Sequence, residues 1–271
     1  MKTLRLRSVV LGEGDPRIIV SLMARSLGEV RSESVKYAAR LADRRNDSAA
    51  PAFDILEWRA DHLESSSEPE AGPRDAVAAL AILREAFPET PVLFTFRSRP
   101  EGGEREIAPE ASRRLLLAVI GSGLADAVDL ELLPSEGHAS EVIAAAHAKG
   151  VAVVMSSHDF SGTPPEEEIL RRLVAMEAAG ADVLKVAVMP RSPADVLALL
   201  SATARCVARP QSAPVITMSM GGLGAAPRLI GAFSGSCATF GALERPSAPG
   251  QIGVEELRTA LSIVGRAVRG S

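Results

Sequence analysis

One lysine lies inside a run of apolar residues that is typical of a buried strand. The run is Asp182 to Pro190, DVLKVAVMP, and the lysine is Lys185. Burial of an ammonium group usually lowers its pKa, because a charge without a partner is costly away from water. An amine that is neutral at about pH 7 attacks carbonyl carbons, so Lys185 is predicted to be a nucleophile. The alternative is a strand-end lysine whose stem lies on apolar surface while its head reaches water.

The other lysines do not compete for this role. Lysine and arginine together number 30, and only four of these residues are lysines. Lys2 lies near the first residue, whereas Lys36 and Lys149 fall in stretches that are typical of solvent-facing helices. Lys185 is therefore the lysine that is placed for chemistry.

Charged residues alternate along a second strand-like run. Glu57, Arg59 and Asp61 are two positions apart, so they share one face of a strand. In a closed barrel the charged face can only be the lumen or its mouth. The alternative is an ion-pair layer that has a structural role inside the barrel.

His158 is predicted to be the acid–base group, because it is the histidine that falls at the end of a strand-like run. An imidazole near neutrality can remove a proton from carbon and return it to a leaving hydroxyl. A strand-end histidine can also be purely structural. Its position next to the strand of Lys185 favours the catalytic interpretation.

Three arginines on separate elements suit a small anionic substrate. Arg59, Arg97 and Arg228 carry guanidinium groups, which bind carboxylates through two parallel hydrogen bonds. The chain has no GK[ST] loop, no HExxH motif and no EF-hand pattern, so neither a nucleotide nor a metal is expected. These residues predict a Schiff-base enzyme that acts on a small carboxylated ketone or aldehyde, and they leave elimination and aldol cleavage open.

The chemistry needs a scaffold, and eight strand-like runs alternate with helix-length segments. They are Ile18–Met23, Phe53–Asp61, Val92–Arg97, Ala127–Leu132, Val151–His158, Val183–Met189, Val215–Met220 and Cys237–Leu243. This pattern predicts an α/β fold, a (β/α)8 TIM barrel that forms one domain over residues 1–271, with a hairpin at Leu4–Leu11 capping the barrel bottom. A doubly wound open sheet is the alternative, but no GxGxxG follows the first strand.

Local signals predict several boundaries between these elements. Thr163 to Glu166 resembles a helix N-cap with an N1 proline and a capping box, and Gly180 is expected to close that helix. The same pattern recurs at Ser192 with Pro193, and in a helix from Pro109 to Gly121. Asp43–Ala52 and Ser65–Gly72 are expected to be surface loops.

Composition narrows the expected partners and cellular location of the protein. The net charge of −4 indicates neither a nucleic-acid nor a membrane partner. The apolar runs are too short to span a bilayer and the first residues do not match a signal peptide, so a cytoplasmic protein is expected. Cys206 and Cys237 show no metal-ligand spacing and are predicted to be free buried thiols.

The sequence resembles the type I 3-dehydroquinate dehydratases of the shikimate pathway. The resemblance runs nearly the whole length, through the ordered segments IIVSLM, EWRAD, FTFRS with EGGE after it, SSHDFSGTPP, LKVAVMP, TMSMGGLG and ATFGALERPSAPGQI. It implies a barrel hydro-lyase that converts 3-dehydroquinate to 3-dehydroshikimate without cofactor or metal. It also implies a homodimer.

The resemblance implies a role for each matching residue. Lys185 corresponds to the lysine that forms an imine with the substrate ketone, and His158 to the general base that becomes the general acid. Glu101 corresponds to the glutamate near that histidine, and Arg228 to the arginine that holds the substrate carboxylate. The remaining positions that match substrate-contacting or pocket-lining residues are Ser21, Glu57, Arg59, Arg97, Met220, Phe240, Ser247 and Gln251. The SAPGQ stretch resembles a loop that closes over bound substrate.

Three positions depart from the family pattern. Gly222 stands where many members carry a lysine, and Pro227 could shift the start of a helix and the reach of Arg228. Ser157 replaces a common aromatic residue, a change expected to be mild.

Two other functions use some of the same residues. A class I aldolase would share the lysine, but it usually needs a phosphate-binding loop after the seventh and eighth strands. A catalytically dead metabolite sensor would need neither Lys185 nor His158.

Overall fold

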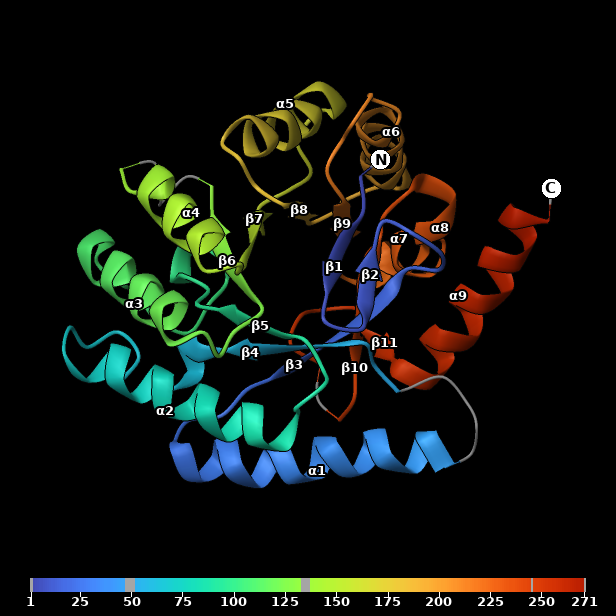
Figure 1. Cartoon of the computed structure of the whole chain (residues 1–271). Helices are drawn as coiled ribbons and strands as arrows, with labels where there is room; N and C mark the ends of the chain where they lie inside the picture. The colour runs from blue at the N-terminus through green and yellow to red at the C-terminus, as the bar shows by residue number, and fades with distance from the viewer. Residues whose placement is uncertain (1, 47–51, 133–136, 245, 271) are drawn as a thin grey trace.

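Eight parallel strands curl into a barrel that is surrounded by helices, as predicted (Figure 1). The computed structural model describes residues 2–46, 52–132, 137–244 and 246–270. The barrel strands are β3 (Arg17–Leu22), β4 (Ile55–Arg59), β5 (Val92–Thr95), β6 (Ala127–Glu131), β7 (Ala152–Asp159), β8 (Val183–Val188), β9 (Val215–Ser219) and β10 (Ala238–Ala242). Strands β3 to β9 pair in chain order, β10 pairs with β3, and a short β11 (Ile252–Gly253) extends the sheet beside β10. Between β9 and β10 the barrel closes through an isolated bridge, in which the Cys237 N–H donates to the Val215 carbonyl at 2.8 Å.

One helical segment follows each barrel strand. The long helices are α1 (Leu27–Asn46), α2 (Ala71–Ala86), α3 (Pro109–Ser122), α4 (Ala139–Ala148), α5 (Glu166–Ala178), α6 (Pro193–Val207) and α9 (Val254–Arg269). After β9 the segment consists instead of short pieces, namely the 3-10 turn η3 (Gly222–Gly224), α7 (Ala225–Leu229) and α8 (Gly231–Ser234). Two further 3-10 turns, η1 (Ala60–His62) and η2 (Arg99–Glu101), follow β4 and β5. Every helix among the described residues is too short or too polar to cross a bilayer.

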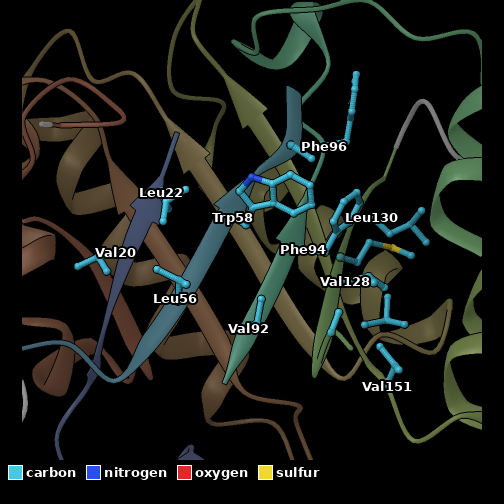
Figure 2. Close-up of a cluster of buried hydrophobic side chains, with 14 of the residues drawn as sticks. Val20, Leu22, Leu56, Trp58, Val92, Phe94, Phe96, Val128, Leu130 and Val151 are labelled. Carbon is cyan, nitrogen blue, oxygen red and sulfur yellow. The ribbon is translucent and has the colours of Figure 1, made fainter. Parts of the chain in front are cut away.

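Alternation along the strands separates the helix-facing core from the barrel interior. Figure 2 shows apolar side chains on the helix-facing side of β3 to β6, among them Val20, Leu22, Leu56, Trp58, Phe94, Val128 and Leu130. The rings of Trp58 and Phe94 meet edge to face with centroids 5.6 Å apart. The residues between them, including Ser21, Glu57 and Asp129, must therefore face the barrel interior.

The predicted hairpin closes the bottom of the barrel. Strands β1 (Leu4–Leu6) and β2 (Val9–Leu11) pair antiparallel, and Leu6 and Leu11 are buried. They belong to a second apolar cluster with Ile19, Ile55 and Leu93, which lie in the barrel strands. The hydrophobic interior thus fills the lower part of the barrel and leaves its upper part to polar side chains.

Three aspartates fasten the strands together at this lower end. Asp54, Asp126 and Asp182 each precede an alternate strand, and each carboxylate accepts the backbone N–H of the preceding strand at 2.7–2.8 Å. Each also has a basic side chain as partner, which is Arg258, Arg84 or His147 respectively. These contacts fix the register in which the carboxyl ends of the strands meet.

Several predicted boundaries need correction. The helix after Thr163 has Pro165 as its N-cap and no side-chain cap, so the capping box predicted there is wrong. Gly180 does follow that helix, with φ +97°, and the capping box at Ser192 is formed with Asp195. Helix α3 continues past Gly121 to Ser122, and the left-handed residue that ends it is Gly123.

The two predicted surface loops are shorter than expected. Residues 43–46 belong to α1, while residues 47–51 lie outside the described part of the chain. In the second stretch, Ala71 and Gly72 belong to α2 and Ser66 is buried. Both cysteines are buried free thiols, as predicted.

Candidate active site

A pocket with an empty volume of about 490 Å³ opens at the carboxyl ends of the barrel strands. Its wall is formed by Glu57, Arg59, Arg97, Glu101, Gly102, His158, Phe160, Lys185, Ala187, Met218, Met220, Phe240, Ser247, Ala248 and Gln251. Of the residues predicted from the sequence, only Ser21 and Arg228 are missing from this wall. The structure therefore brings ten of the twelve predicted residues into one pocket.

Lys185 is buried and has anionic partners. Its side chain is 4% exposed, which excludes the alternative in which the lysine head reaches water. Nζ donates to Asp129 Oδ2 at 3.2 Å and lies 3.7 Å from Glu57 Oε1. It also lies 4.8 Å from the centroid of the Phe240 ring. Two carboxylates and an aromatic face therefore surround Nζ.

His158 is held by Glu101, two strands away. The last residues of β7 pair with β8, so that Ser156 lies beside Lys185 and His158 beside Ala187. The Nδ1 atom of His158 lies 2.9 Å from Glu101 Oε2, which also accepts the backbone N–H of His158 at 3.1 Å. When Nδ1 donates to the carboxylate, Nε2 is left as the free base.

Burial shifts the pKa values of His158 and Glu101 in opposite directions. Desolvation holds the pKa of His158 well below its usual value, and the charges of Arg97, Lys185 and Arg59 lower it further. Desolvation raises the pKa of Glu101 to about 8, despite the opposing charge of Arg97. The imidazole is therefore neutral at neutral pH, and the carboxyl group titrates close to the pH range in which an enzyme works.

Arg97 lies at the centre of a buried ionic cluster. Its Nη2 donates to Asp129 Oδ2 at 2.7 Å, and its Nη1 donates to Glu131 Oε1 at 3.0 Å and to Ser156 Oγ at 2.9 Å. Glu101 is a fourth partner, 3.3 Å from Nη1. Burial acts to lower the pKa of Arg97, but the surrounding carboxylates raise it overall. A single cation thus compensates much of the negative charge on this side of the barrel.

The charged residues predicted on one face of β4 and just after it, Glu57, Arg59 and Asp61, have two different roles. Glu57 accepts hydrogen bonds from Ser21 Oγ at 2.5 Å and from Thr95 Oγ1 at 2.9 Å, beside Lys185. Arg59 forms a two-point ion pair with Asp61, at 2.7 and 2.8 Å. The structural ion pair considered as an alternative is therefore present for Asp61, while Glu57 and Arg59 also line the pocket.

The SAPGQ loop lies across the pocket. Ser247 Oγ donates to Ser21 Oγ at 2.9 Å, and the Gln251 side chain binds both the backbone N–H and the hydroxyl of Ser247 at 2.8 Å. At the loop tip the Gly221 N–H donates to the Pro249 carbonyl at 3.1 Å. Gly250 has φ +78°, and a Cβ atom there would lie 2.2 Å from the carbonyl oxygen of Gly221. Only glycine permits this close approach.

Arg228 lies behind the pocket wall, completely buried. Its two Nη atoms donate to the carbonyls of Phe240 and Pro249, both at 3.4 Å, and its Nε has no hydrogen-bond partner in the described part of the chain. Burial lowers the pKa of Arg228 to about 10, and no ion pair to it is formed within the described residues. Pro227 occupies the third position of α7. The short helix holds Arg228 beneath the loop.

The sequence did not predict the partners of the lysine. Asp129 and Glu131 are alternate residues at the end of a strand-like run, the same signal that marked Glu57 and Arg59. Phe160 and Met218 also line the wall; a Cβ on Gly102 would lie 2.2 Å from the Phe160 ring. Ser157 faces the helices, where its hydroxyl accepts from Arg172 at 3.3 Å.

The carboxylates of the pocket are engaged by cations. In the part of the chain that the structure describes, no three histidine, cysteine or acidic side chains are arranged to hold a metal ion. Arg59, Arg97 and Lys185 instead pair with the acidic groups around them.

Polar and titratable groups gathered at the carboxyl ends of barrel strands are the arrangement of a (β/α)8-barrel enzyme. Residues 34–267 match the family model of type I 3-dehydroquinase. The 3-dehydroquinate dehydratases of Escherichia coli O157:H7 and Shigella flexneri are each 49% identical over 267 residues, which cover 98% of this chain and 100% of theirs. The chain belongs to the type I 3-dehydroquinase family, and its activity is the hydro-lyase reaction of 3-dehydroquinate dehydration in the shikimate pathway.

Solved structures of this family superpose closely on the chain. The type I 3-dehydroquinate dehydratase of Clostridium difficile, which carries covalently modified comenic acid, matches with a TM-score of 0.88 and 37% identity over 98% of this chain and 99% of its own. The Geobacillus kaustophilus 3-dehydroquinate dehydratase matches with a TM-score of 0.86 and 37% identity over 97% and 96%. The predicted barrel and the predicted family are thus confirmed.

Proposed function

We propose that the pocket dehydrates 3-dehydroquinate through an imine on Lys185, with His158 as the base and then the acid. The observation that carries this proposal is a buried lysine and a histidine held by Glu101 in the wall of the same pocket. A lysine that served packing alone would have no need of an open cavity at its amine.

The steps balance without a cofactor. The Lys185 amine attacks the ketone carbon, and the ketone oxygen leaves as water to give an iminium ion. His158 removes a proton from the neighbouring carbon, and the electron pair moves into the iminium. Loss of the hydroxyl group from the next carbon is assisted by the proton that His158 returns, so that a second water is released. Hydrolysis of the imine then regenerates the amine and frees 3-dehydroshikimate.

The surrounding charges suit these steps. The carboxylates of Asp129 and Glu57 beside Nζ stabilise the positive charge of the iminium. The neutral state of His158, which burial favours, is the state that can accept a proton. We assign Glu101 the role of orienting the imidazole.

Substrate binding is assigned to other residues of the wall and to Arg228. The guanidinium of Arg228 has an unpartnered Nε and no ion pair among the described residues, which suits a carboxylate ligand. Hydroxyl groups of the substrate are assigned to Glu57, Arg59, Ser247 and Gln251, and Ser21 supports them through its hydrogen bonds to Glu57 and Ser247. Met220 and Phe240 supply apolar contact with the ring.

Borohydride trapping tests this mechanism. The protein is incubated with 3-dehydroquinate and reduced, and mass spectrometry then locates the added mass. We expect the adduct on Lys185, and neither adduct nor turnover with Lys185→Ala. Folded wild-type protein that turns over substrate without an adduct, or a Lys185→Ala variant that loses less than tenfold in activity, would remove the imine mechanism.

We further propose a cytoplasmic homodimer that works without cofactor or metal. The net charge of −4 and the full-length match to the curated relatives support a small-molecule enzyme. Sedimentation velocity gives the oligomeric state directly, and full activity after exhaustive chelation is the result expected of a metal-free reaction.

A further inference from the structure

Arg97 touches the same two oxygen atoms that hold the proposed catalytic side chains. Its Nη1 lies 3.3 Å from Glu101 Oε2, the atom that is 2.9 Å from His158 Nδ1. Its Nη2 donates at 2.7 Å to Asp129 Oδ2, the atom that accepts from Lys185 Nζ at 3.2 Å. One planar guanidinium therefore joins the proposed base to the proposed nucleophile through two carboxylate oxygens.

The remaining contacts hold this guanidinium in place. Ser156 Oγ accepts from Nη1 at 2.9 Å and donates to the other oxygen of Asp129 at 2.7 Å. Glu131 Oε1 accepts from Nη1 at 3.0 Å and from the Ser98 N–H at 2.8 Å. The Arg97 side chain is 4% exposed. Both Nη atoms are thus directed at protein groups, which contrasts with the substrate contact expected from the sequence.

We propose that Arg97 is a positioning residue that fixes His158 and Lys185 relative to each other through Glu101 and Asp129. The proposal rests on the proposed function, because it assumes that these two side chains carry the reaction. A guanidinium suits this task, since its donors lie in one plane in fixed directions, whereas a lysine presents a single point charge on a flexible stem. Misplacement of a reacting group by ~1 Å can reduce the rate by ~10².

The charge of Arg97 has a second effect on the same groups. Glu101 and His158 are faced by the cations Arg97, Lys185 and Arg59 and by the carboxylates Glu131 and Asp129, while Glu57 faces Arg97. Within this set, the charge of Arg97 lowers the pKa of Glu101 and also that of His158. Its removal must raise both pKa values. The acid limb of the profile of kcat/KM against pH is then expected to move to higher pH.

Two substitutions of Arg97 separate the effect of its planar geometry from the effect of its charge. Arg97→Lys keeps a cation among the carboxylates but loses the planar fork, so kcat should fall by ~10² with KM within about threefold and the acid limb nearly unmoved. Arg97→Gln loses both the positive charge and the planar fork. Its kcat should fall at least as far, and the acid limb of kcat/KM should move to higher pH. Arg97→Lys alone decides the matter if Arg97→Gln does not fold.

Arg59→Gln is the matched control. Arg59 lines the same pocket, but its guanidinium is held by Asp61 and makes no hydrogen bond to the partners of His158 or Lys185. Its loss should raise KM more than it lowers kcat. If Arg97→Lys shows that same pattern, with KM raised and kcat unchanged, Arg97 is a substrate contact and the proposal is overturned.

A measurement on the ligand-free protein tests the positioning role of Arg97 independently of the proposed imine mechanism. NMR titration of the His158 imidazole in the ligand-free protein should show a higher pKa in Arg97→Gln than in the wild type. An unchanged titration together with unchanged kcat would overturn the positioning role, whatever the trapping experiment shows. Absence of an imine on Lys185 in the wild type, with the NMR shift present, would instead count against the mechanism alone.

Discussion

The imidazole of His158 and the carboxylate of Glu101 meet with 2.9 Å between Nδ1 and Oε2. The oxygen that takes part also accepts the backbone N–H of His158, so the carboxylate fixes both the ring and its strand. These two groups titrate as a pair, because each changes the charge that the other faces.

Glu101→Gln should shift the pH dependence of the enzyme. Burial raises the pKa of Glu101 to about 8, so below that pH the carboxyl group holds a proton that it can donate to Nδ1. The other ring nitrogen then carries the hydrogen and cannot act as base. Glutamine accepts from Nδ1–H at every pH, so the acid limb of kcat/KM should move to lower pH. An acid limb at the same pH in both proteins would show that Glu101 does not set it.

His158→Ala should separate imine formation from elimination. Lys185 lies on a different strand and keeps Asp129 and Glu57 as partners, so borohydride trapping should still modify it. Turnover should fall by the ~10² to 10⁴ expected for a lost acid–base group. A variant that turns over normally would show that another group moves the proton.

Gly250→Ala should disturb the SAPGQ loop, which lines the pocket. The new Cβ atom would lie 2.2 Å from the Gly221 carbonyl oxygen, a backbone atom that cannot move aside, at a residue with φ +78°. The loop would then leave its position, taking Ser247 and Gln251 with it, so KM should rise by roughly tenfold or more, since lost polar contacts cost ~1–2 kcal/mol.

Gly222→Ala is the control for this change. None of the residues that the structure describes lies within 4 Å of a Cβ atom at Gly222, so this neighbouring substitution should leave KM unchanged. Equal KM values for the two variants would mean that the loop does not contribute to binding.

Arg228→Ala should mainly weaken substrate binding. Among the described residues the guanidinium has two long hydrogen bonds to carbonyls and no anionic partner, and burial lowers its pKa to about 10. A carboxylate ligand would relieve this cost. KM should therefore rise by ~10-fold or more, in line with the ~1.5–3 kcal/mol of a hydrogen bond to a charged group, with a smaller change in kcat. An unchanged KM would show that another arginine holds the carboxylate.

The sequence was sufficient to predict the barrel and most of the pocket wall. Alternation along a strand-like run identified Glu57 and Arg59, because the interior of a barrel admits charge only near its mouth, and Lys185 was identified as a lysine inside an apolar run. The order of the strands then follows from their order in the chain. Predicting these residues and this strand order therefore requires no knowledge of contacts between residues far apart in the sequence.

The hydrogen-bond partners within the buried ionic cluster were not predictable from alternation. Asp129 reaches Lys185 across the barrel interior, from β6 to β8, and this contact depends on strand register and side-chain direction. The position of Arg228 depends on the short pieces α7 and α8, where a single helix was expected. The missing cap at Thr163 has a local reason, since the helix begins only at Glu166, after two prolines.

The register that brings these groups together is set at the other end of the barrel, and Asp126→Asn tests this. The Asp126 carboxylate accepts the Val92 N–H at 2.8 Å and pairs with Arg84 at 2.6 Å and with Arg7 of the hairpin turn at 2.7 Å. Asparagine keeps the shape but loses the charge, so the free energy of unfolding should fall by ~1–3 kcal/mol in a urea titration. The kinetic constants should be unchanged at a temperature where the variant is folded, because the site lies at the opposite end. Asp182→Asn should cost less, since its partner His147 is 46% exposed. Identical unfolding free energies for the wild type and Asp126→Asn would show that these carboxylates do not hold the strands in register.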